Sequence, residues 1–164
     1  MTAPVRTGKR SVSASQVEMT QLVLPNDTNV LGNLLGGRLM EWMDIAAAIS
    51  AQRHSNRICV TAAVDNLVFH QPIRLGEVVT LKASVNRVFG SSMEVGVSVS
   101  SENQLTGLRK TANTAYLTFV AISEVGTPEK VAPIHPVTAA ERRRHREALD
   151  RRNFRLQNRR RPGR

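Results

Sequence analysis

Cysteine is nearly absent from this sequence of 164 residues, and long apolar runs are missing altogether. The single cysteine, Cys59, has no partner for an internal disulfide, so nothing in the sequence requires an oxidising compartment. No apolar run approaches the length of a membrane span, and the N-terminus lacks the apolar centre of a secretion signal. We therefore expect a cytoplasmic protein with no membrane span.

Signatures of metal and nucleotide sites are also missing. The four histidines do not have the spacing of metal ligands, and a single cysteine cannot form a Cys-x-x-Cys pair. No glycine-rich motif of the Walker or dinucleotide-binding type is present. We expect no metal ion and no cofactor.

Acidic residues are scarce at both ends of the chain, so the net charge of +10 belongs to the termini. Residues 1–16 carry three basic residues and no acid, and residues 137–164 carry eleven arginines against three acids. Residues 17–136 hold nine basic and ten acidic residues and are close to neutral. We interpret the Arg-rich C-terminus as a solvated tail and expect no nucleic-acid partner, although phosphate binding by this tail is the alternative.

What the sequence does contain is a helix-forming stretch from Gly37 to His54, with no proline and almost no β-branched residue. Its large apolar residues spread around most of the circumference, which predicts a buried helix. They are Leu39, Met40, Trp42, Met43, Ile45 and Ile49. Asp44 lies in the middle of this stretch, and a carboxylate in apolar surroundings needs partners. Asp44 is therefore a candidate for chemistry, and the alternative is an acid that reaches water or pairs with a neighbour.

Gly36-Gly37 opens the predicted helix. The backbone N–H groups of a glycine pair are unobstructed, and here they lie at the positive end of the helix dipole. Such an end can hold an anion or a developing oxyanion, whereas the simpler interpretation is a turn before a helix.

Five runs of residues have the composition of β-strands. They cover residues 17–24, 58–69, 79–85, 93–99 and 108–122, and the fourth has the clearest alternation of apolar and polar residues. Short turns such as Phe89-Gly90-Ser91-Ser92 join most of them, so we expect antiparallel pairing. The order predicts an α+β fold in which a curved antiparallel sheet of about five strands wraps around one long central helix. Because one helix covers only part of one face, the apolar late strands also predict self-association.

The chain divides into three segments. We expect a mobile N-terminal segment at 1–16, a domain at 17–125, and a proline-containing connection with an Arg-rich peripheral helix at 126–164. Thr138 and Glu141 have the spacing of a capping box, and the helix after them continues to about Gln157 with only a thin apolar contact.

Several short motifs, taken in their order and spacing, resemble the acyl-CoA thioesterases of the hotdog fold, which include bacterial broad-range and animal cytosolic enzymes. The motifs lie between about Val17 and Val120, and they are Pro25-Asn26-Asp27-Thr28-Asn29, Gly32-Asn33, Gly36-Gly37, Leu39-Met40, Met43-Asp44, Ala51-Gln52-Arg53-His54, Thr61-Ala62-Ala63-Val64-Asp65, Phe69-His70, Pro72-Ile73 and Gly90-Ser91-Ser92-Met93-Glu94. The resemblance implies the hotdog fold, in agreement with the periodicity, and hydrolysis of fatty acyl-CoA to a free fatty acid and CoA.

The resemblance also implies two polar catalytic residues contributed by opposite subunits of a homodimer. They match Asn33, before the helix, and Asp44, within it. Asp44 would be the general base for a water or the direct nucleophile, and Asn33 would orient the water or the carbonyl. The backbone N–H of Gly37 is the candidate oxyanion donor. Such enzymes often assemble into trimers of dimers, so a hexamer is expected.

The CoA part of the substrate is polyanionic and needs cations and open backbone. The resemblance places the pantetheine along Gly90-Ser91-Ser92, with the phosphates near basic side chains whose alternative role is ordinary solvated charge. The expected substrate-binding residues are Gly36, Thr61, Asn66, Arg87, Gly90, Ser91, Ser92, Arg109 and Lys110. A non-catalytic acyl-CoA-binding protein on the same fold is the alternative function, and it would need the pocket but not Asp44.

Overall fold

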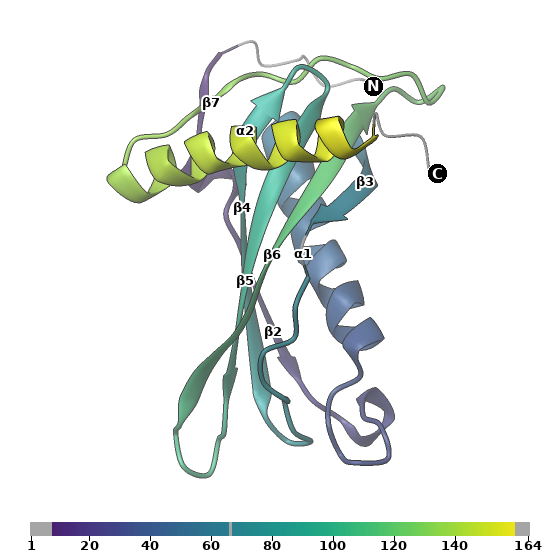
Figure 1. The fold of residues 1–164 in the computed structure, drawn as a ribbon, viewed down its shortest axis with the longest axis vertical. Coiled ribbons are helices and arrows are strands. Elements are labelled where there is room, and N and C mark those ends of the chain that lie inside the picture. The colour runs from purple at the N-terminus through teal and green to yellow at the C-terminus, as the bar shows by residue number, and fades with distance from the viewer. Residues whose placement is uncertain (1–7, 66, 160–164) are drawn as a thin grey trace.

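The structure is a computed structural model that describes residues 8–65 and 67–159. Its larger sheet has five antiparallel strands in the order β2-β4-β5-β6-β3. These are β2 (Val17–Leu22), β3 (Ile58–Asp65), β4 (Val78–Phe89), β5 (Ser92–Glu102) and β6 (Arg109–Ile122). Helix α1 (Gly36–Ser55) lies along one face of the curved sheet, and α2 (Ala139–Arg159) crosses the other (Figure 1). The α+β fold with a curved sheet around one long helix is confirmed.

The core lies between α1 and the inner face of the sheet. On β5, Met93, Val95, Val97 and Val99 are each no more than 1% exposed and belong to this core. The residues between them point to the outer face, because successive side chains of a strand alternate. The period-two pattern of the sequence therefore identified the inner face of this strand correctly.

Helix α1 is buried on only one side. Ala46 and Ala47 are fully buried, and their small side chains let the helix approach the sheet closely. On the other side, Met40, Ile45 and Ile49 are 43%, 42% and 38% exposed. The prediction of a helix buried all round is therefore wrong for a single protomer, and an apolar stripe is left uncovered.

Strand β3 lies at an edge of the sheet, away from its neighbour in sequence. It pairs with β6, with Ile58 opposite Ile122 and Asp65 opposite Tyr116, whereas β4 pairs with β2 and β5. The connection from Asp65 to Val78 therefore leads to a strand that β3 does not touch, and β3 is shorter than the predicted run of residues 58–69. Alternation along the sequence predicts strands but does not give this order.

The N-terminal segment differs from the mobile stretch expected for residues 1–16. Strand β1 (Arg10–Ser11) pairs in parallel with β7 (Ile134–His135), and a short 3-10 helix, η1 (Val12–Ser15), follows. A second 3-10 helix, η2 (Pro25–Asp27), leads toward α1. Residues 1–7 lie outside the described part of the chain.

Two contacts explain why residues 10–15 are structured. The Arg10 guanidinium donates hydrogen bonds to the carbonyl oxygens of Arg53, at 2.8 Å, and of His54, at the C-terminal end of α1, where a cation is favourable. The fully buried Ser15 hydroxyl accepts a hydrogen bond from the Val85 N–H at 2.9 Å. These polar partners have no periodic signature, so the sequence pattern could not reveal them.

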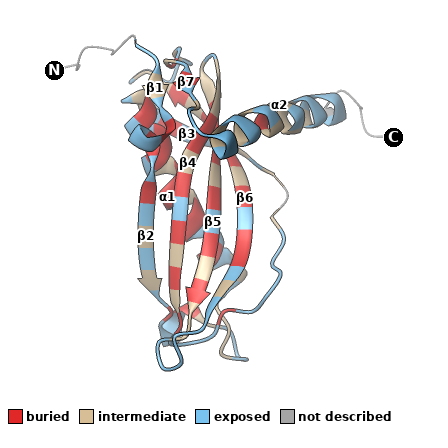
Figure 2. Cartoon of the chain, turned by 90° about the vertical axis from the view of Figure 1, so that its left-hand side faces the viewer, coloured by how far each residue is buried: buried red, intermediate tan, exposed pale blue. Residues whose placement is uncertain are grey.

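Helix α2 begins with the predicted capping box. The Glu141 N–H donates to Thr138 Oγ1 at 3.1 Å, and the Thr138 N–H donates to Glu141 Oε2 at 3.0 Å. Figure 1 shows the helix across the outer side of the sheet, and Figure 2 shows that most of its surface is exposed. Ala148 is fully buried while Phe154 is 66% exposed, so the apolar contact is thin. Among the described residues, no helix combines the length and the apolar character needed to cross a membrane.

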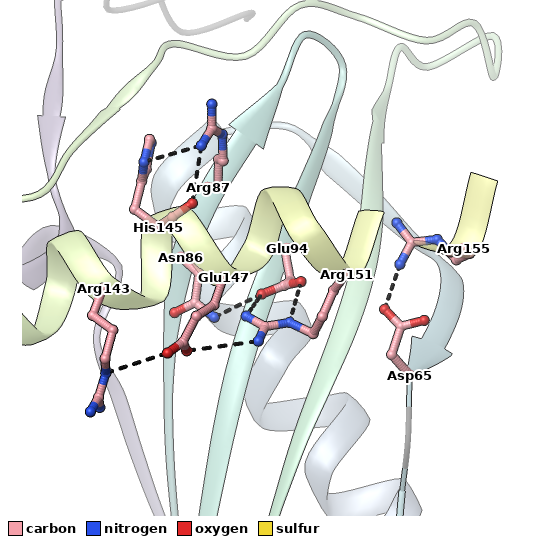
Figure 3. Close-up of polar contacts among 9 residues, drawn as sticks. All are labelled: Asp65, Asn86, Arg87, Glu94, Arg143, His145, Glu147, Arg151 and Arg155. Carbon is pink, nitrogen blue, oxygen red and sulfur yellow. Dashed lines mark hydrogen bonds and ion pairs between the residues drawn. The ribbon is translucent and has the colours of Figure 1, made fainter. Parts of the chain in front are cut away.

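Charged side chains hold α2 on the sheet (Figure 3). Arg151 donates to both carboxylate oxygens of Glu94, at 2.7 and 3.0 Å, and its guanidinium carbon lies 3.5 Å from the centre of the Tyr116 ring. Burial lowers the pKa of Arg151, but the hydrogen bond and charge of Glu94 outweigh burial, and the net effect raises that pKa. Arg155 forms a second ion pair, with Asp65 at the end of β3.

The imidazole of His54 should make stability depend on pH. Burial is the main cause that lowers the pKa of His54 below its ordinary value of 6.5. Its Nε2 atom contacts the Ala132 carbonyl oxygen at 2.8 Å, and its Nδ1 atom is buried without a partner among the described residues. The unfolded state then binds the proton more readily, so the contribution of His54 is complete above pH 6.5 and is lost as the pH falls toward the folded-state pKa. We expect urea unfolding to show a smaller stability loss between pH 7.5 and 5.5 for His54→Gln than for the unmodified chain. Equal losses would contradict this.

Candidate active site

An apolar hollow of about 400 Å³ opens between α1 and strands β3 and β6. Its apolar wall consists of Met40, Met43, Val64, Leu67, Ala115 and Leu117. Gly37, Glu41, Asp44 and Thr61 complete the lining. The hollow therefore combines a surface suited to an acyl chain with one carboxylate and one hydroxyl close together.

Asp44 has a specific partner in this hollow. Thr61 Oγ1 donates a hydrogen bond to Asp44 Oδ1 at 2.7 Å, from β3 to α1. The pairing of β3 with β6 shifts between Thr61 and Ala63, and a bulge of this kind re-aims side chains beside it. The carboxylate is half-buried and keeps one oxygen outside this bond, so it can accept a proton or approach a carbonyl carbon.

Gly37 and Asp44 line the same hollow but cannot act on the same atom. They are seven residues apart on one helix, which puts them on the same face and about 10 Å apart along the axis. The N–H groups of the first turn, Gly37 among them, have no acceptor within the helix. A thioester held against Asp44 would therefore take its oxyanion donors from somewhere other than Gly37 of the same protomer.

A second hollow, of about 330 Å³, contains the predicted Asn33 together with Asn29. Asn29 Oδ1 accepts hydrogen bonds from the N–H groups of Leu31, at 3.0 Å, and Asn33, at 3.2 Å, so its side chain shapes the loop before α1. The structure does not bring Asn33 and Asp44 together within one protomer. Sequence reasoning missed Asn29, although it is the last residue of the quoted Pro25-Asn26-Asp27-Thr28-Asn29 motif.

Gly36 lies in this second hollow for a steric reason. A Cβ atom on Gly36 would meet the Phe69 ring at 3.3 Å, which is closer than ordinary van der Waals contact. Phe69 and the following residues line the same hollow, so the glycine lets this loop close over the start of α1.

The predicted CoA-binding residues fall at opposite ends of the sheet. Gly90, Ser91 and Ser92 form the turn between β4 and β5, and Ser92 pairs with Val120, whereas Glu102 at the other end of β5 pairs with Arg109. An eleven-residue strand separates them by about 33 Å. Both ends cannot contact the same part of one CoA molecule in one protomer.

The predicted cations have different surroundings. Arg87 donates to the His145 carbonyl oxygen at 3.1 Å beneath α2, on the outer face. Arg109 pairs with Glu102 at 2.9 Å and is largely exposed, and its neighbour Lys110 is half-buried. Asn66 lies outside the described residues. Among residues 8–65 and 67–159, no three His, Cys, Asp or Glu side chains are grouped as a metal site would need.

An apolar surface continues from the hollow along the free edge of the sheet. On β3, Ile58, Val60 and Val64 are 51%, 43% and 44% exposed. Val64 faces α1 and lines the apolar hollow, whereas Ile58 and Val60 pair with Ile122 and Val120 and point to the outer face. An edge strand with apolar side chains presents unpaired backbone groups, which favours pairing with another chain.

The comparisons with known proteins agree with this architecture. The model of the thioesterase superfamily matches residues 31–108. The uncharacterized acyl-CoA thioester hydrolase YkhA of Bacillus subtilis is 43% identical over 146 residues, which cover 89% of this chain and 85% of YkhA. This chain belongs to the acyl-CoA thioester hydrolases of the thioesterase superfamily.

Solved structures of similar hydrolases share the fold. An apo hexameric acyl-CoA thioesterase is 37% identical, with a TM-score of 0.87 and coverage of 91% of this chain and 97% of that one. The Staphylococcus aureus acyl-CoA hydrolase, in complex with butyryl coenzyme A, coenzyme A and coenzyme A disulfide, is 33% identical, with a TM-score of 0.86 and 92% of both chains covered. Other structures of that hydrolase carry alanine in place of an aspartate, an asparagine or a threonine.

Mammalian relatives of this hydrolase family are longer. The chain spans only 24% of the length of mouse acyl-coenzyme A thioesterase 11, to which it is 43% identical. It spans 26% of the length of the rat and mouse acetyl-coenzyme A thioesterases.

Proposed function

We propose that this protein hydrolyses acyl-CoA thioesters to a free acid and CoA. The observation that carries the proposal is the Asp44 carboxylate, hydrogen-bonded to Thr61 at 2.7 Å, at the edge of an apolar hollow. A water oxygen adds to the thioester carbon, the carbon–sulfur bond breaks, and the sulfur leaves as a thiol. Asp44 either takes the proton from that water and returns it to the sulfur, or attacks the carbon itself before water releases the acid.

We propose that the complete site forms between two protomers. Because Gly37 is about 10 Å from Asp44 along α1, the oxyanion donors for the thioester at Asp44 would come from the first turn of α1 in the second protomer. The loop before that turn carries both asparagines, so it would bring an amide side chain to the same place. A homodimer would then contain two such sites.

The spacing of exchanged residues in the S. aureus hydrolase supports Asn29 as that amide. There, the asparagine stands 15 positions before the aspartate, and the threonine stands 17 positions after it. Asn29, Asp44 and Thr61 have this same spacing here, whereas Asn33 stands only 11 positions before Asp44. We therefore favour Asn29 and keep Asn33, chosen from the sequence, as the second candidate.

The exposed edge of β3 and the uncovered stripe of α1 are the proposed dimer interface. Pairing two β3 strands would satisfy their free backbone groups and cover Ile58, Val60 and Val64. A hexameric relative supports further assembly into a trimer of dimers. The CoA part is proposed to bind either at Gly90, Ser91 and Ser92 or at Arg109 and Lys110. A cytoplasmic location and the lack of a nucleic-acid partner stay predictions.

The function is tested by incubating the purified protein with acyl-CoAs of several chain lengths and measuring free thiol. We expect CoA release by the unmodified chain and only background release by Asp44→Ala. No release above that control at any chain length would contradict the proposal. Thermal stabilisation by acyl-CoA without release would instead indicate a non-catalytic acyl-CoA-binding protein.

Mixed dimers test the shared site. Inactive Asp44→Ala and inactive Asn29→Ala chains, refolded together, form mixed dimers in which one site has both residues intact. Random pairing should therefore restore about one quarter of the unmodified rate. The same mixture with Asn33→Ala decides between the two asparagines, and no recovery with either would place Asp44 and its amide in one protomer.

Thr61 should contribute to the rate through its bond to Asp44. Thr61→Val keeps the size of the side chain but removes the donor, and a hydrogen bond to a charged group is worth about 1.5 kcal/mol. We expect kcat to fall about tenfold. Thr61→Ser keeps the hydroxyl and should retain most of the rate, so equal losses in both variants would contradict this role.

A further inference from the structure

The outer face of the sheet contains a larger hollow that the hydrolase proposal does not use. It measures about 530 Å³ and lies beside α2, on the opposite side of the sheet from Asp44. The side chains that matter for the argument are Lys82, Asn86, Ser98, Thr114 and Arg144. The lining also contains the carboxylate of Glu18 and apolar residues such as Val17 and Val97, but it is more polar than the lining of the apolar hollow.

Asn86, which lines this hollow, has a buried oxygen atom without a donor. Asn86 is only 2% exposed, its Nδ2 donates to Glu94 Oε1 at 2.9 Å, and its Oδ1 has no hydrogen-bond partner among the described residues. Figure 3 shows the carboxamide with its nitrogen toward Glu94 and its oxygen turned away. Gly96 leaves room for this arrangement, because a Cβ atom there would lie 2.8 Å from Asn86 Nδ2. A buried carbonyl oxygen without a donor is costly, so this site favours a molecule that supplies an O–H or N–H.

Two cations line the same hollow. Arg144 lines the hollow from α2, and within the described part of the chain its guanidinium has no ion pair or side-chain hydrogen bond. Lys82 lines the hollow too, and its 3.4 Å contact with Glu18 joins two side chains that are both more than 60% exposed. Glu18 also lines the hollow, and Glu141 lies near Arg144, but exposed charge pairs are weak. An anion that enters the hollow can therefore compete for both cations.

We propose that this hollow binds a small oxyanion that also carries hydroxyl groups, such as a polyol phosphate or a hydroxycarboxylate. The anionic group pairs with Arg144, because a guanidinium accommodates carboxylate and phosphate oxygens with two parallel hydrogen bonds. A hydroxyl of the ligand donates to Asn86 Oδ1, and Ser98 and Thr114 offer further partners. The proposal does not depend on thioester hydrolysis.

The two hollows share one strand but no residue. On β6, Thr114 and Tyr116 line the outer hollow, whereas Ala115 and Leu117 line the apolar one. Binding at the outer hollow can therefore be measured in Asp44→Ala, which leaves β6 and α2 unchanged.

Isothermal titration calorimetry tests the proposal with four molecules. Ribose 5-phosphate, a polyol phosphate, and gluconate, a hydroxycarboxylate, each carry an anionic group and hydroxyl groups. Inorganic phosphate supplies the anionic group without the polyol, and ribose supplies the hydroxyl groups without the anion. We expect millimolar or tighter binding of ribose 5-phosphate, gluconate or both, and at least tenfold weaker binding of phosphate and ribose. Arg144→Met should weaken binding at least tenfold, while the matched control Arg142→Met, an exposed arginine of the same helix outside the hollow, should leave it unchanged.

Three results would overturn the proposal. The first is that the folded chain binds neither ribose 5-phosphate nor gluconate. The second is equal weakening by Arg142→Met, which would indicate general charge attraction. The third is unchanged binding in Thr114→Val and Arg144→Met together, since both side chains line the hollow and Thr114 is exposed enough for replacement without unfolding.

Discussion

Replacement of Asp44 by asparagine is expected to lower kcat for acyl-CoA hydrolysis by about 100- to 10,000-fold, the range associated with a positioned acid or base. Asparagine keeps the shape of the side chain and can still accept the hydrogen bond from Thr61 Oγ1, but it can neither take a proton from water nor attack a thioester effectively. The measurement is a steady-state assay of CoA release with the variant and the unmodified chain side by side.

A stability control makes this prediction specific. The melting temperature of Asp44→Asn should stay close to that of the unmodified chain, because Asp44 is half-buried and its hydrogen bond is retained. A folded variant that keeps more than one tenth of the rate would contradict the role of Asp44.

The second large effect is expected on stability, at the ion pair beneath α2. Arg151→Met keeps much of the side chain's packing but leaves the Glu94 carboxylate, which is 2% exposed, without its cation. Removing one partner of a buried pair destabilises a protein by about 3 kcal/mol or more, because the remaining charge stays uncompensated. Urea unfolding followed by circular dichroism should show this loss.

The matched variants separate charge from packing. Arg143→Met removes an exposed arginine of the same helix, whose contact with Glu147 is 3.6 Å long, and should cost little. The double variant Glu94→Gln with Arg151→Met should recover more than half of the loss, because glutamine is neutral and can still accept from Asn86 Nδ2. If the double variant were as unstable as Arg151→Met, packing on Tyr116 and not charge would hold the helix.

Local patterns predicted the elements well, and the reasons are local too. Apolar residues alternate along β5 because adjacent side chains of a strand point to opposite faces, and Thr138 with Glu141 marks a helix start because both act within one turn. The stretch around Asp44 identified α1 in the same way. In contrast, the apolar residues all round α1 predicted a helix that is buried on every side within one chain. The structure leaves Ile45 and Ile49 of this helix exposed.

The candidate site shows the same division. Asp44 stands out in the sequence because it is a carboxylate in an apolar helix, and Thr61 was predicted only as a substrate-binding residue. Their hydrogen bond joins residues on different elements, so no periodicity announces it. The sequence analysis named Asn33 and did not consider Asn29, because a motif does not show which side chain shapes the loop before α1.

The sequence by itself determined the strands, the long helix, the near-neutral domain between basic ends, and the acid on which the chemistry is proposed to depend. These features follow from the spacing of apolar side chains and from the positions of charged residues along the sequence, both of which are local. Only the tertiary structure decided that β3 pairs with β6 at the sheet edge, that Thr61 meets Asp44, and that Arg151 covers Glu94. Those contacts join residues far apart in the chain, and their energies depend on burial and geometry that exist only after folding.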